Sequence, residues 1–203
     1  QLNKNIFMFN FLYYKIIMKK LNLGSGDKRI PGFLNVDKFN TFEPDVLHDL
    51  EIFPYPFLEN EIEEIKLIHV LEHIGQTPDI FINIMKELYR ICCDQANIHI
   101  SVPHPRHDDF LADPTHVRPI TTLGLSLFDL DLNKKWQKIG AANTPLAMIH
   151  NVNFKIIKNE VVLDSKYLKL LEDKKISKNE LNETIEKYNN VVKQTNYILK
   201  VLK

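Results

Sequence analysis

The chain has 203 residues and a mass of 23.8 kDa, which is enough for one sizeable hydrophobic core. Its 26 lysines and arginines balance its 26 aspartates and glutamates, and its mean hydropathy of -0.21 is ordinary for a globular protein. A neutral chain has little attraction for nucleic acid or for an anionic membrane. We therefore expect neither as a partner and favour a small molecule.

The two cysteines, Cys92 and Cys93, are adjacent. Neighbouring thiols cannot join distant segments by a disulfide, and the chain has no Cys-x-x-Cys pair for a zinc site. This usage is typical of a protein in the reducing cytoplasm, which is where we expect the chain.

The first residues are strongly apolar. The stretch Ile6 to Met18 is shorter than the roughly 20 residues that a membrane-spanning helix needs, and it contains Asn10 and Lys15. Met18-Lys19-Lys20-Leu21 leads directly into the first expected strand. We expect residues 1–17 to be an N-terminal extension or an added helix.

Short apolar runs alternate with loops and one helical pattern over the next 85 positions or so. Strands are expected at residues 21–23, 33–36, 45–48, 62–70 and 98–102. Apolar residues at helical spacing, introduced by Pro78, predict a helix from there to about Cys92. Strands and helices that alternate in this way favour a parallel sheet with helices on both faces.

Beyond the fifth strand, the pattern changes. Residues 104–149 are rich in His, Asp and Pro and are predicted to be a long insertion on the substrate side. Residues 154–157 and 161–163 are predicted to close the sheet as an antiparallel hairpin that turns at Lys158-Asn159-Glu160.

The C-terminal part, residues 164–203, is predicted to be a helical tail. Ser177 and Glu180 form a capping box, and apolar residues follow at alternating spacings of four and three. The stripe fits either a terminal helix packed on its own domain or a coiled coil that joins two copies of the chain. Its members are Leu181, Ile185, Tyr188, Val192, Thr195, Leu199 and Leu202.

A glycine turn follows the first strand in Leu21-Asn22-Leu23-Gly24-Ser25-Gly26. Glycines there permit positive φ and let a ligand lie against bare backbone. Asp37 closes the second strand, where nucleotide-binding sheets place an acid that accepts hydrogen bonds from ribose hydroxyls.

The series LNLGSG, NVD, HDL, HVLEH, ELYRI and SVPHP resembles the class I methyltransferases. It looks most similar to the small methyltransferase-domain group that continues with a DPTHVRPIT-like segment, found here at Asp113 to Thr121. The resemblance covers residues 20–163 and implies a Rossmann-like α/β domain over residues 18–163, with a mostly parallel sheet.

The resemblance also implies S-adenosylmethionine as the cofactor, bound at the carboxyl ends of the strands. By this resemblance, Gly24, Ser25 and Gly26 would wrap its methionine part, and Asp37 would hold its ribose. The adenine would be framed by Asp49 and Leu50, and the sulfonium would lie beside His69.

Three features depart from the family pattern. Only ten residues, 24–33, connect the first two strands, so the first helix must be a single turn or absent. Lys28 stands where a third glycine is usual, and Asp94-Gln95-Ala96 replaces a Pro-Gly-Gly turn. No Gly-Lys-Ser/Thr follows the glycines, which excludes a phosphate loop, and the short spacing to Asp37 disfavours a nicotinamide enzyme.

Polar residues of the insertion are the candidates for chemistry. We predict His104 or His107 as a general base and expect Arg106, His116 and Arg118 to contact the acceptor. The alternative is that these side chains only satisfy backbone groups in an ordered loop.

A metal site is a further alternative, carried by His69-x-x-Glu72-His73. If Glu72 and His73 begin a helix, a histidine from residues 104–116 completes a mixed nitrogen and oxygen set that suits zinc, manganese or iron. We favour the simpler interpretation, in which Glu72 caps that helix and no metal is bound.

Together these patterns predict an S-adenosylmethionine-dependent methyltransferase that acts on a small-molecule, sugar or glycan-type acceptor. Two alternatives remain open: a non-catalytic binding module that acts through its helical tail, and a nicotinamide-dependent oxidoreductase.

Overall fold

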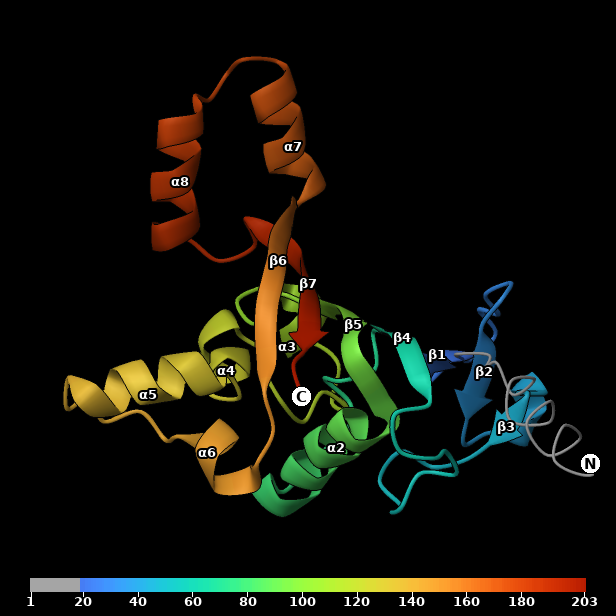
Figure 1. The fold of residues 1–203 in the computed structure, drawn as a ribbon. Coiled ribbons are helices and arrows are strands. Elements are labelled where there is room, and N and C mark those ends of the chain that lie inside the picture. The colour runs from blue at the N-terminus through green and yellow to red at the C-terminus, as the bar shows by residue number, and fades with distance from the viewer. Residues whose placement is uncertain (1–18) are drawn as a thin grey trace, which may run out of the picture.

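A computed structural model describes residues 19–203, so the expectation for residues 1–17 lies outside the described part of the chain. At its centre is a seven-stranded sheet with the order β3-β2-β1-β4-β5-β7-β6 (Figure 1). The strands are β1 (Lys19–Leu23), β2 (Leu34–Asp37), β3 (Val46–Leu47), β4 (Ile62–Ile68), β5 (Cys92–Pro103), β6 (Phe154–Leu163) and β7 (Val192–Val201).

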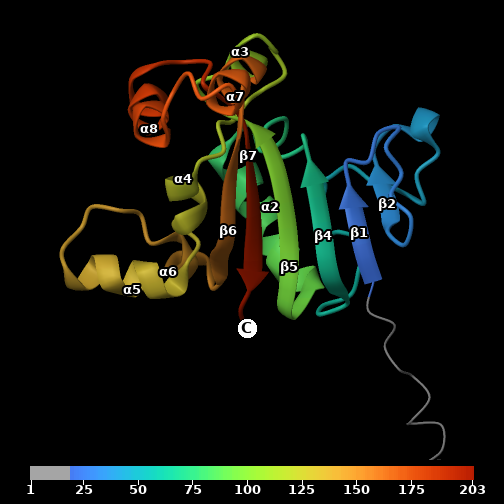
Figure 2. The same cartoon turned by 90° about the horizontal axis from the view of Figure 1, so that it is seen from above.

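The sheet is mostly parallel, as expected. Strands β1 to β5 pair in parallel, and β7 runs antiparallel to both β5 and β6. The carboxyl ends of the parallel strands therefore meet at one edge, where the arrowheads of β1, β4 and β5 lie together in Figure 2. The predicted Rossmann-like architecture is confirmed.

Helix α2 (Pro78–Ile91) forms where the sequence predicts it. The hydroxyl of Thr77 accepts the N–H of Ile80, and Pro78 fits the first turn because its missing N–H has no partner there anyway. Four apolar side chains of α2 are buried against the sheet: Ile84, Met85, Leu88 and Ile91.

The strands alternate between a buried apolar face and a face with half-exposed polar side chains. On the second face, Lys20 Nζ lies 2.8 Å from Glu64 Oε2, and His99 Nε2 lies 3.3 Å from Glu64 Oε1. Cross-strand ion pairs on a solvent-facing sheet replace the helix that we expected on this face. Within residues 19–203, the helical cover predicted for both faces is thus present on one.

The missing helix follows from the connection between β1 and β2. Residues 24–33 form no helix, and side-chain amides hold them instead. Asn22 Nδ2 donates to Lys28 O at 2.9 Å and to Asn35 Oδ1 at 3.0 Å, and Ile30 N donates to the same Asn35 oxygen at 3.0 Å. These bonds satisfy loop backbone groups that a helix would otherwise satisfy internally.

The prediction of a closing hairpin within residues 154–163 is wrong. Lys158, Asn159 and Glu160 continue a single strand, β6, whose partner is β7. The antiparallel closure does occur, but its second strand comes from residues that we assigned to the tail.

The heptad prediction is wrong for the same reason. Leu181 and Ile185 lie in helix α8 (Lys178–Lys187), whereas Val192, Thr195 and Leu199 lie in β7. In β7, residues 195, 197, 199 and 201 are buried in alternation, which a spacing of four and three partly imitates. The coiled coil, and with it the homo-oligomer through a C-terminal helix, loses its basis.

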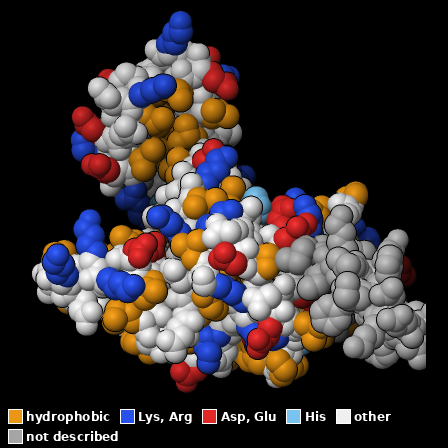
Figure 3. Space-filling model, viewed as in Figure 1, with side chains coloured by type: hydrophobic (Ala, Val, Ile, Leu, Met, Phe, Trp, Pro, Cys, Tyr) orange, Lys and Arg blue, Asp and Glu red, His pale blue; other side chains and the backbone are white. Residues whose placement is uncertain are grey.

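The domain boundary at residue 163 is corrected accordingly. The sheet domain extends to β7, and residues 164–191 form an insertion, here called the arm, which contains α7 (Ser165–Glu172) and α8. The capping box of Ser177 and Glu180 is present at the start of α8. The arm stands at the carboxyl edge beside α3 (Asp108–Leu111), as Figure 2 shows. Hydrophobic side chains gather between its two helices (Figure 3).

The substrate-side insertion contains short helices rather than irregular chain. After α3 come α4 (Thr122–Ser126), α5 (Leu130–Lys138) and α6 (Leu146–His150). Outside this insertion, a 3-10 turn, η1 (Asn40–Phe42), follows β2. Among the described residues, no helix has the length and apolarity needed to cross a bilayer.

The observed strand β7 and the helical stripe predicted from the sequence lead to different expectations for the free energy of unfolding. Leu199 is fully buried in β7, whereas Tyr188 is 60% exposed at the end of α8. Leu199→Ala should lower the free energy of unfolding by about 2–5 kcal/mol, and Tyr188→Ala by less than about 0.5 kcal/mol. Urea unfolding checks this, and equal effects of the two substitutions would favour the coiled coil.

Candidate functional site

A pocket of about 240 Å³ opens at the carboxyl edge where β1, β2 and β4 end. We call it the glycine-turn pocket. It is lined by Gly24, Gly26, Asp37, Lys38, Phe39, Phe42, His48, Asp49, Leu50, His69, Val70, His73 and Ile74.

The two glycines of the turn have different reasons to be glycine. Gly24 has φ +65°, and a Cβ there would lie 2.6 Å from Val70 Cγ2, so both the backbone and the packing exclude a side chain. Gly26 has φ +50°, but a Cβ there would meet nothing within 4 Å. The turn is thus packed on β4's end at Gly24 and open at Gly26.

Asp37 connects the turn to the end of β2. Its Oδ2 accepts the N–H of Gly26 at 2.8 Å, and its Oδ1 accepts the N–H of Phe39 at 2.9 Å. A carboxylate has about four acceptor positions, so two remain for a ligand. Asp37 is 7% exposed and lines the pocket, which makes it a rigid acceptor at the pocket wall.

Six of the seven residues that we predicted for the cofactor line this one pocket: Gly24, Gly26, Asp37, Asp49, Leu50 and His69. Ser25 does not, because its N–H donates to Val36 O at 3.1 Å and its side chain is buried. Sequence reasoning missed Phe39 and Phe42, whose rings meet edge to face at 6.3 Å. Two aromatic residues directly after a strand-closing acid were the available signal.

His69 stands at the boundary between two pockets. It follows β4 with φ +55°, a strained conformation for a residue with a side chain. Its Nε2 lies 3.0 Å from Gln194 Oε1, its Nδ1 lies 3.3 Å from Glu72 Oε1, and the carboxylate of Glu72 raises its pKa. Beyond it is a second, polar pocket, the His69–Asp109 pocket, lined by His69, Pro103, Asp109, His116, Lys193 and Gln194.

Arg106 and His107 contact the arm rather than either of these pockets. The guanidinium of Arg106 donates to the carbonyls of Ile185 and Glu186 at the end of α8. His107 is buried, caps α3 by accepting the N–H of Asp109 at 3.0 Å, and has Nε2 3.5 Å from Asp164, which caps α7. The alternative of ordering a loop therefore describes both residues better than their predicted roles.

His104 is also separated from the glycine-turn pocket. Its Nδ1 accepts the N–H of Arg106 at 3.2 Å, and it lines a different hollow together with Thr195 and Tyr197 of β7. Burial, followed by the charge of Arg106, lowers its pKa. A lowered pKa favours the neutral ring that a base requires, but His104 lies away from the predicted cofactor residues.

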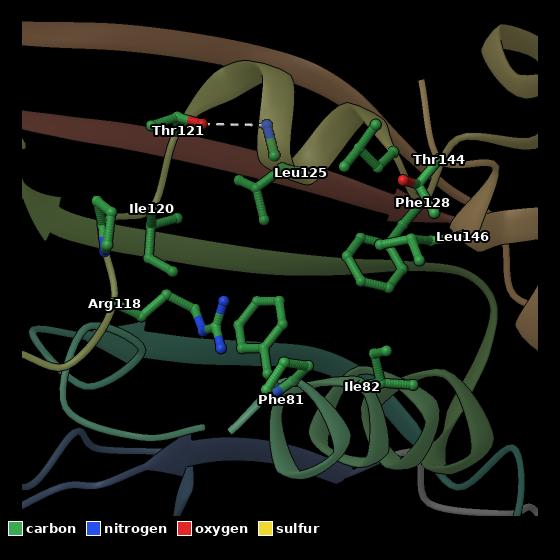
Figure 4. Close-up of a pocket in the computed structure, with 13 residues that line it drawn as sticks. Phe81, Ile82, Arg118, Ile120, Thr121, Leu125, Phe128, Thr144 and Leu146 are labelled. Atoms are coloured by element: carbon green, nitrogen blue, oxygen red, sulfur yellow. Dashed lines mark hydrogen bonds between the residues drawn. The ribbon is translucent and has the colours of Figure 1, made fainter. Parts of the chain in front are cut away.

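Arg118 lies in another pocket, which is apolar and shares no lining residue with the glycine-turn pocket. Figure 4 shows its guanidinium beside the ring of Phe81, with Ile120, Leu125 and Phe128 around the cavity. The guanidinium lies 4.4 Å from the ring centroid and donates twice to Gly75 O, at 3.1 and 2.8 Å. Its observed role is to hold residues 75 and 118 together.

Glu72 does not cap a helix, contrary to the simpler interpretation of the HVLEH motif. It lies in a turn between β4 and α2, and α2 is capped by Thr77. Glu72 is 1% exposed, and neither of its carboxylate oxygens has a hydrogen-bond partner among the described residues. Its backbone carbonyl accepts the N–H groups of Val117 and Arg118, which docks residues 113–118 on this turn.

His116 is brought to the same turn by this docking. Its ring lies 4.5 Å from the ring of His73, centroid to centroid. Glu72, His73 and His116 each offer a ligand atom, and these atoms lie within 4.8 Å of one another. Of the predicted acceptor residues, His116 alone also lines the His69–Asp109 pocket.

Comparison with known proteins bears on the fold. The sequence matches no protein-family model, and no curated protein is similar to it. A SAM-dependent methyltransferase from Archaeoglobus fulgidus has a TM-score of 0.60 at 16% identity, over 96% of this chain and 91% of its own. One from Methanosarcina mazei has a TM-score of 0.53 at 12% identity, over 97% of each chain. The YcgJ protein from Bacillus subtilis has a TM-score of 0.51, also at 12% identity and over 97% of each chain.

The fold is that of the SAM-dependent methyltransferases. The sequence motifs predicted this fold, and the strand order agrees with the prediction. No protein-family model matches the sequence, so the fold is recognised from the structure. At these identities the comparison establishes the methyltransferase fold, and the chemistry must be argued from the residues of the site.

The glycine turn predicts a graded response to alanine. Gly26→Ala and Gly32→Ala, both at positive φ with open space, should each lower the free energy of unfolding by about 1 kcal/mol. Gly24→Ala adds the clash with Val70 and should lower it by about 2–4 kcal/mol. In the double variant with Val70→Ala the clash disappears, so denaturant unfolding should show less than additive losses; full additivity would contradict the packing argument.

The contacts of Arg106 predict a local effect. Arg106→Ala should speed amide hydrogen exchange in residues 178–191, because the end of α8 loses two donors. Lys187→Ala, which removes only an exposed pair with Glu183, is the matched control on α8. Unchanged exchange in the Arg106 variant would show that its side chain does not hold the arm.

Proposed function

We propose that this chain is an S-adenosylmethionine-dependent methyltransferase that binds its cofactor in the glycine-turn pocket. The observation that carries the proposal is that Gly24, Gly26 and Asp37 border a single pocket, with Asp37 Oδ2 bonded to the N–H of Gly26 at 2.8 Å. S-adenosylmethionine needs bare backbone beside its methionine part and an acceptor for the hydrogen bonds of its ribose hydroxyls, and this pocket offers both.

The remaining walls suit the two ends of such a ligand. Asp37 keeps two acceptor positions for the ribose hydroxyls. Phe39 and Phe42 are 54% and 39% exposed at the pocket, and Leu50 lies across it, so they offer apolar surface to an adenine ring. The glycine turn remains for the methionine part.

Methyl transfer requires the acceptor atom, the methyl group and the leaving sulfur to lie in line. Methyl transfer from a sulfonium is a displacement in line with the leaving sulfur, and holding acceptor and methyl in line can supply roughly 7–11 kcal/mol. His69 lines both the glycine-turn pocket and the His69–Asp109 pocket, so the two meet at that residue. We place the methyl group beside His69 and the acceptor in the second pocket.

The acceptor is proposed to be a polar small molecule, of which a sugar or glycan is one kind. The His69–Asp109 pocket presents a carboxylate from Asp109, an ammonium from Lys193 and an amide from Gln194, which together bond hydroxyl groups of either polarity. Lys193 Nζ lies 3.5 Å from Asp109 Oδ2, so the pocket is close to neutral overall.

A pair of isosteric substitutions tests the cofactor site. Asp37→Asn should weaken binding of S-adenosylmethionine and S-adenosylhomocysteine by about 10–100-fold, since an amide cannot accept on both sides. The matched control is Asp129→Asn, because Asp129 is also 7% exposed and also accepts a backbone N–H, from Leu132 at 2.9 Å. Isothermal titration calorimetry measures both, with NAD as the competing cofactor.

The outcomes separate the readings of the site. Tight binding of S-adenosylhomocysteine together with its formation from S-adenosylmethionine in the presence of polar acceptors, followed by mass spectrometry, supports the enzyme. Binding of both ligands with no turnover against any acceptor favours the non-catalytic module, and preferential binding of NAD overturns the proposal.

A further inference from the structure

Beyond methyl transfer, one buried carboxylate among the described residues is only partly paired. The carboxylate of Glu72 is 1% exposed, and both of its oxygens lack a hydrogen-bond partner within residues 19–203. His69 is its ionic partner, because Nδ1 lies 3.3 Å from Oε1 while Nε2 contacts Gln194 Oε1 at 3.0 Å. This pair leaves Oε2 without a partner among the described residues. Burying an unpaired carboxylate is costly, so such groups are normally paired or bound to a metal.

Two imidazoles stand beside this carboxylate. The ligand atoms of Glu72, His73 and His116 lie within 4.8 Å of one another. Four-coordinate zinc with bonds of about 2.0–2.1 Å needs ligand atoms about 3.4 Å apart, so side-chain rotations on the order of 1 Å close the set. We propose that Glu72, His73 and His116 bind a divalent transition-metal ion.

The hydrogen bonds around the histidines use their Nδ1 atoms and leave Nε2 for a metal, with Nε2 of His116 3.7 Å from Asp113 Oδ2. Nδ1 of His73 lies 2.9 Å from Thr115 Oγ1, which in turn donates to Asp113 Oδ1 at 2.6 Å. Nδ1 of His116 donates to the carbonyl of Phe110 at 2.9 Å. With each Nδ1 used on an oxygen acceptor, the lone pair of each ring is on Nε2, as is usual for metal-binding histidines.

Backbone contacts fix the three ligands relative to one another. The carbonyl of Glu72 accepts Val117 N at 2.9 Å and Arg118 N at 3.2 Å, so His116 is held one residue from an anchored position. The ring of His116 also stacks on Phe110 at 5.3 Å and is 7% exposed. The site is therefore built from two segments that backbone hydrogen bonds hold together, with Glu72 buried and His73 toward the surface.

The chemistry of the donors selects the class of metal. Two imidazole nitrogens and one carboxylate oxygen suit zinc, iron, manganese or cobalt, whereas calcium and magnesium prefer oxygen alone. Three protein ligands leave at least one coordination position open. His73 lines the glycine-turn pocket and His116 lines the His69–Asp109 pocket, so the ion lies where the two meet and can bind an oxygen of the acceptor.

Metal titration of the full chain tests the site without any methyl donor, so its outcome is independent of the proposed function. After treatment with a chelator, the wild-type chain is titrated with Zn²⁺ by calorimetry and with Co²⁺ by visible absorption, which changes when protein ligands replace water. One ion per chain is expected, with a raised melting temperature. Glu72→Gln and His116→Gln should each weaken binding by more than about 100-fold.

Two further variants test whether the metal binds at this site or at histidines elsewhere in the chain. Thr115→Val removes the acceptor of His73 Nδ1 without touching a ligand and should weaken binding by about 10–100-fold. His150 lies in α6 and lines neither pocket of the site. The His150→Gln variant should therefore bind the metal as the wild type does.

Glu72→Gln carries an additional signature. Because it removes a buried carboxylate whose one ionic partner is the half-exposed His69, the metal-free variant should melt at the same temperature as the metal-free wild type or higher, while losing the rise that metal gives. A lower melting temperature of the metal-free variant would mean that Glu72 serves the fold through His69. Absence of Zn²⁺ and Co²⁺ binding by the wild type, or equal binding by Glu72→Gln, would overturn the proposal.

Discussion

The hydrogen bond from the N–H of Gly26 to the carboxylate of Asp37 is the constraint on which the glycine-turn pocket depends. It joins the end of β1 to the end of β2 at the edge of the sheet, in a connection too short for a helix. A helix N-terminus usually supplies free N–H groups and a positive dipole at this place. Here no helix follows β1, so Asp37 and the amides of Asn22 and Asn35 hold the turn instead.

The replacement of a helix by this hydrogen-bonded loop has consequences for the rest of the sheet. Without a helix after β1, one face of the central strands remains half-exposed, and polar side chains such as Glu64 and His99 occupy it. The apolar face, covered by α2 and the helices of the insertion, then carries most of the core. Residues near the carboxyl edge are consequently positioned by loops docked on one another, of which the contact between Glu72 and residues 117–118 is the clearest case.

The parts that could be predicted from sequence are those encoded locally. Pro78 and the apolar spacing of α2 define a helix by its own residues, and Gly24, Gly26 and Asp37 define a turn and an acid at strand ends. The tail could not be read in this way. Leu181 to Leu202 satisfy a helical spacing, but Leu199 is buried because β5 and β6 lie on either side of it, and neither partner is visible in the local pattern.

The same distinction explains the errors at the candidate site. His104, Arg106 and His107 follow β5, so their place near the carboxyl edge was predictable. The partners of Arg106 and His107, however, come from the arm, far along the chain. Once β7 enters the sheet, residues 164–191 must leave and return at that edge, and their helix ends need donors and caps. Arg106 and His107 supply these, whereas the arm leaves Glu72, His73 and His116 without such duties. Polar residues of two loops at the carboxyl edge have thus divided into those that hold the arm and those that do not, and the long-range pairing of β7 is what brings the arm to this edge.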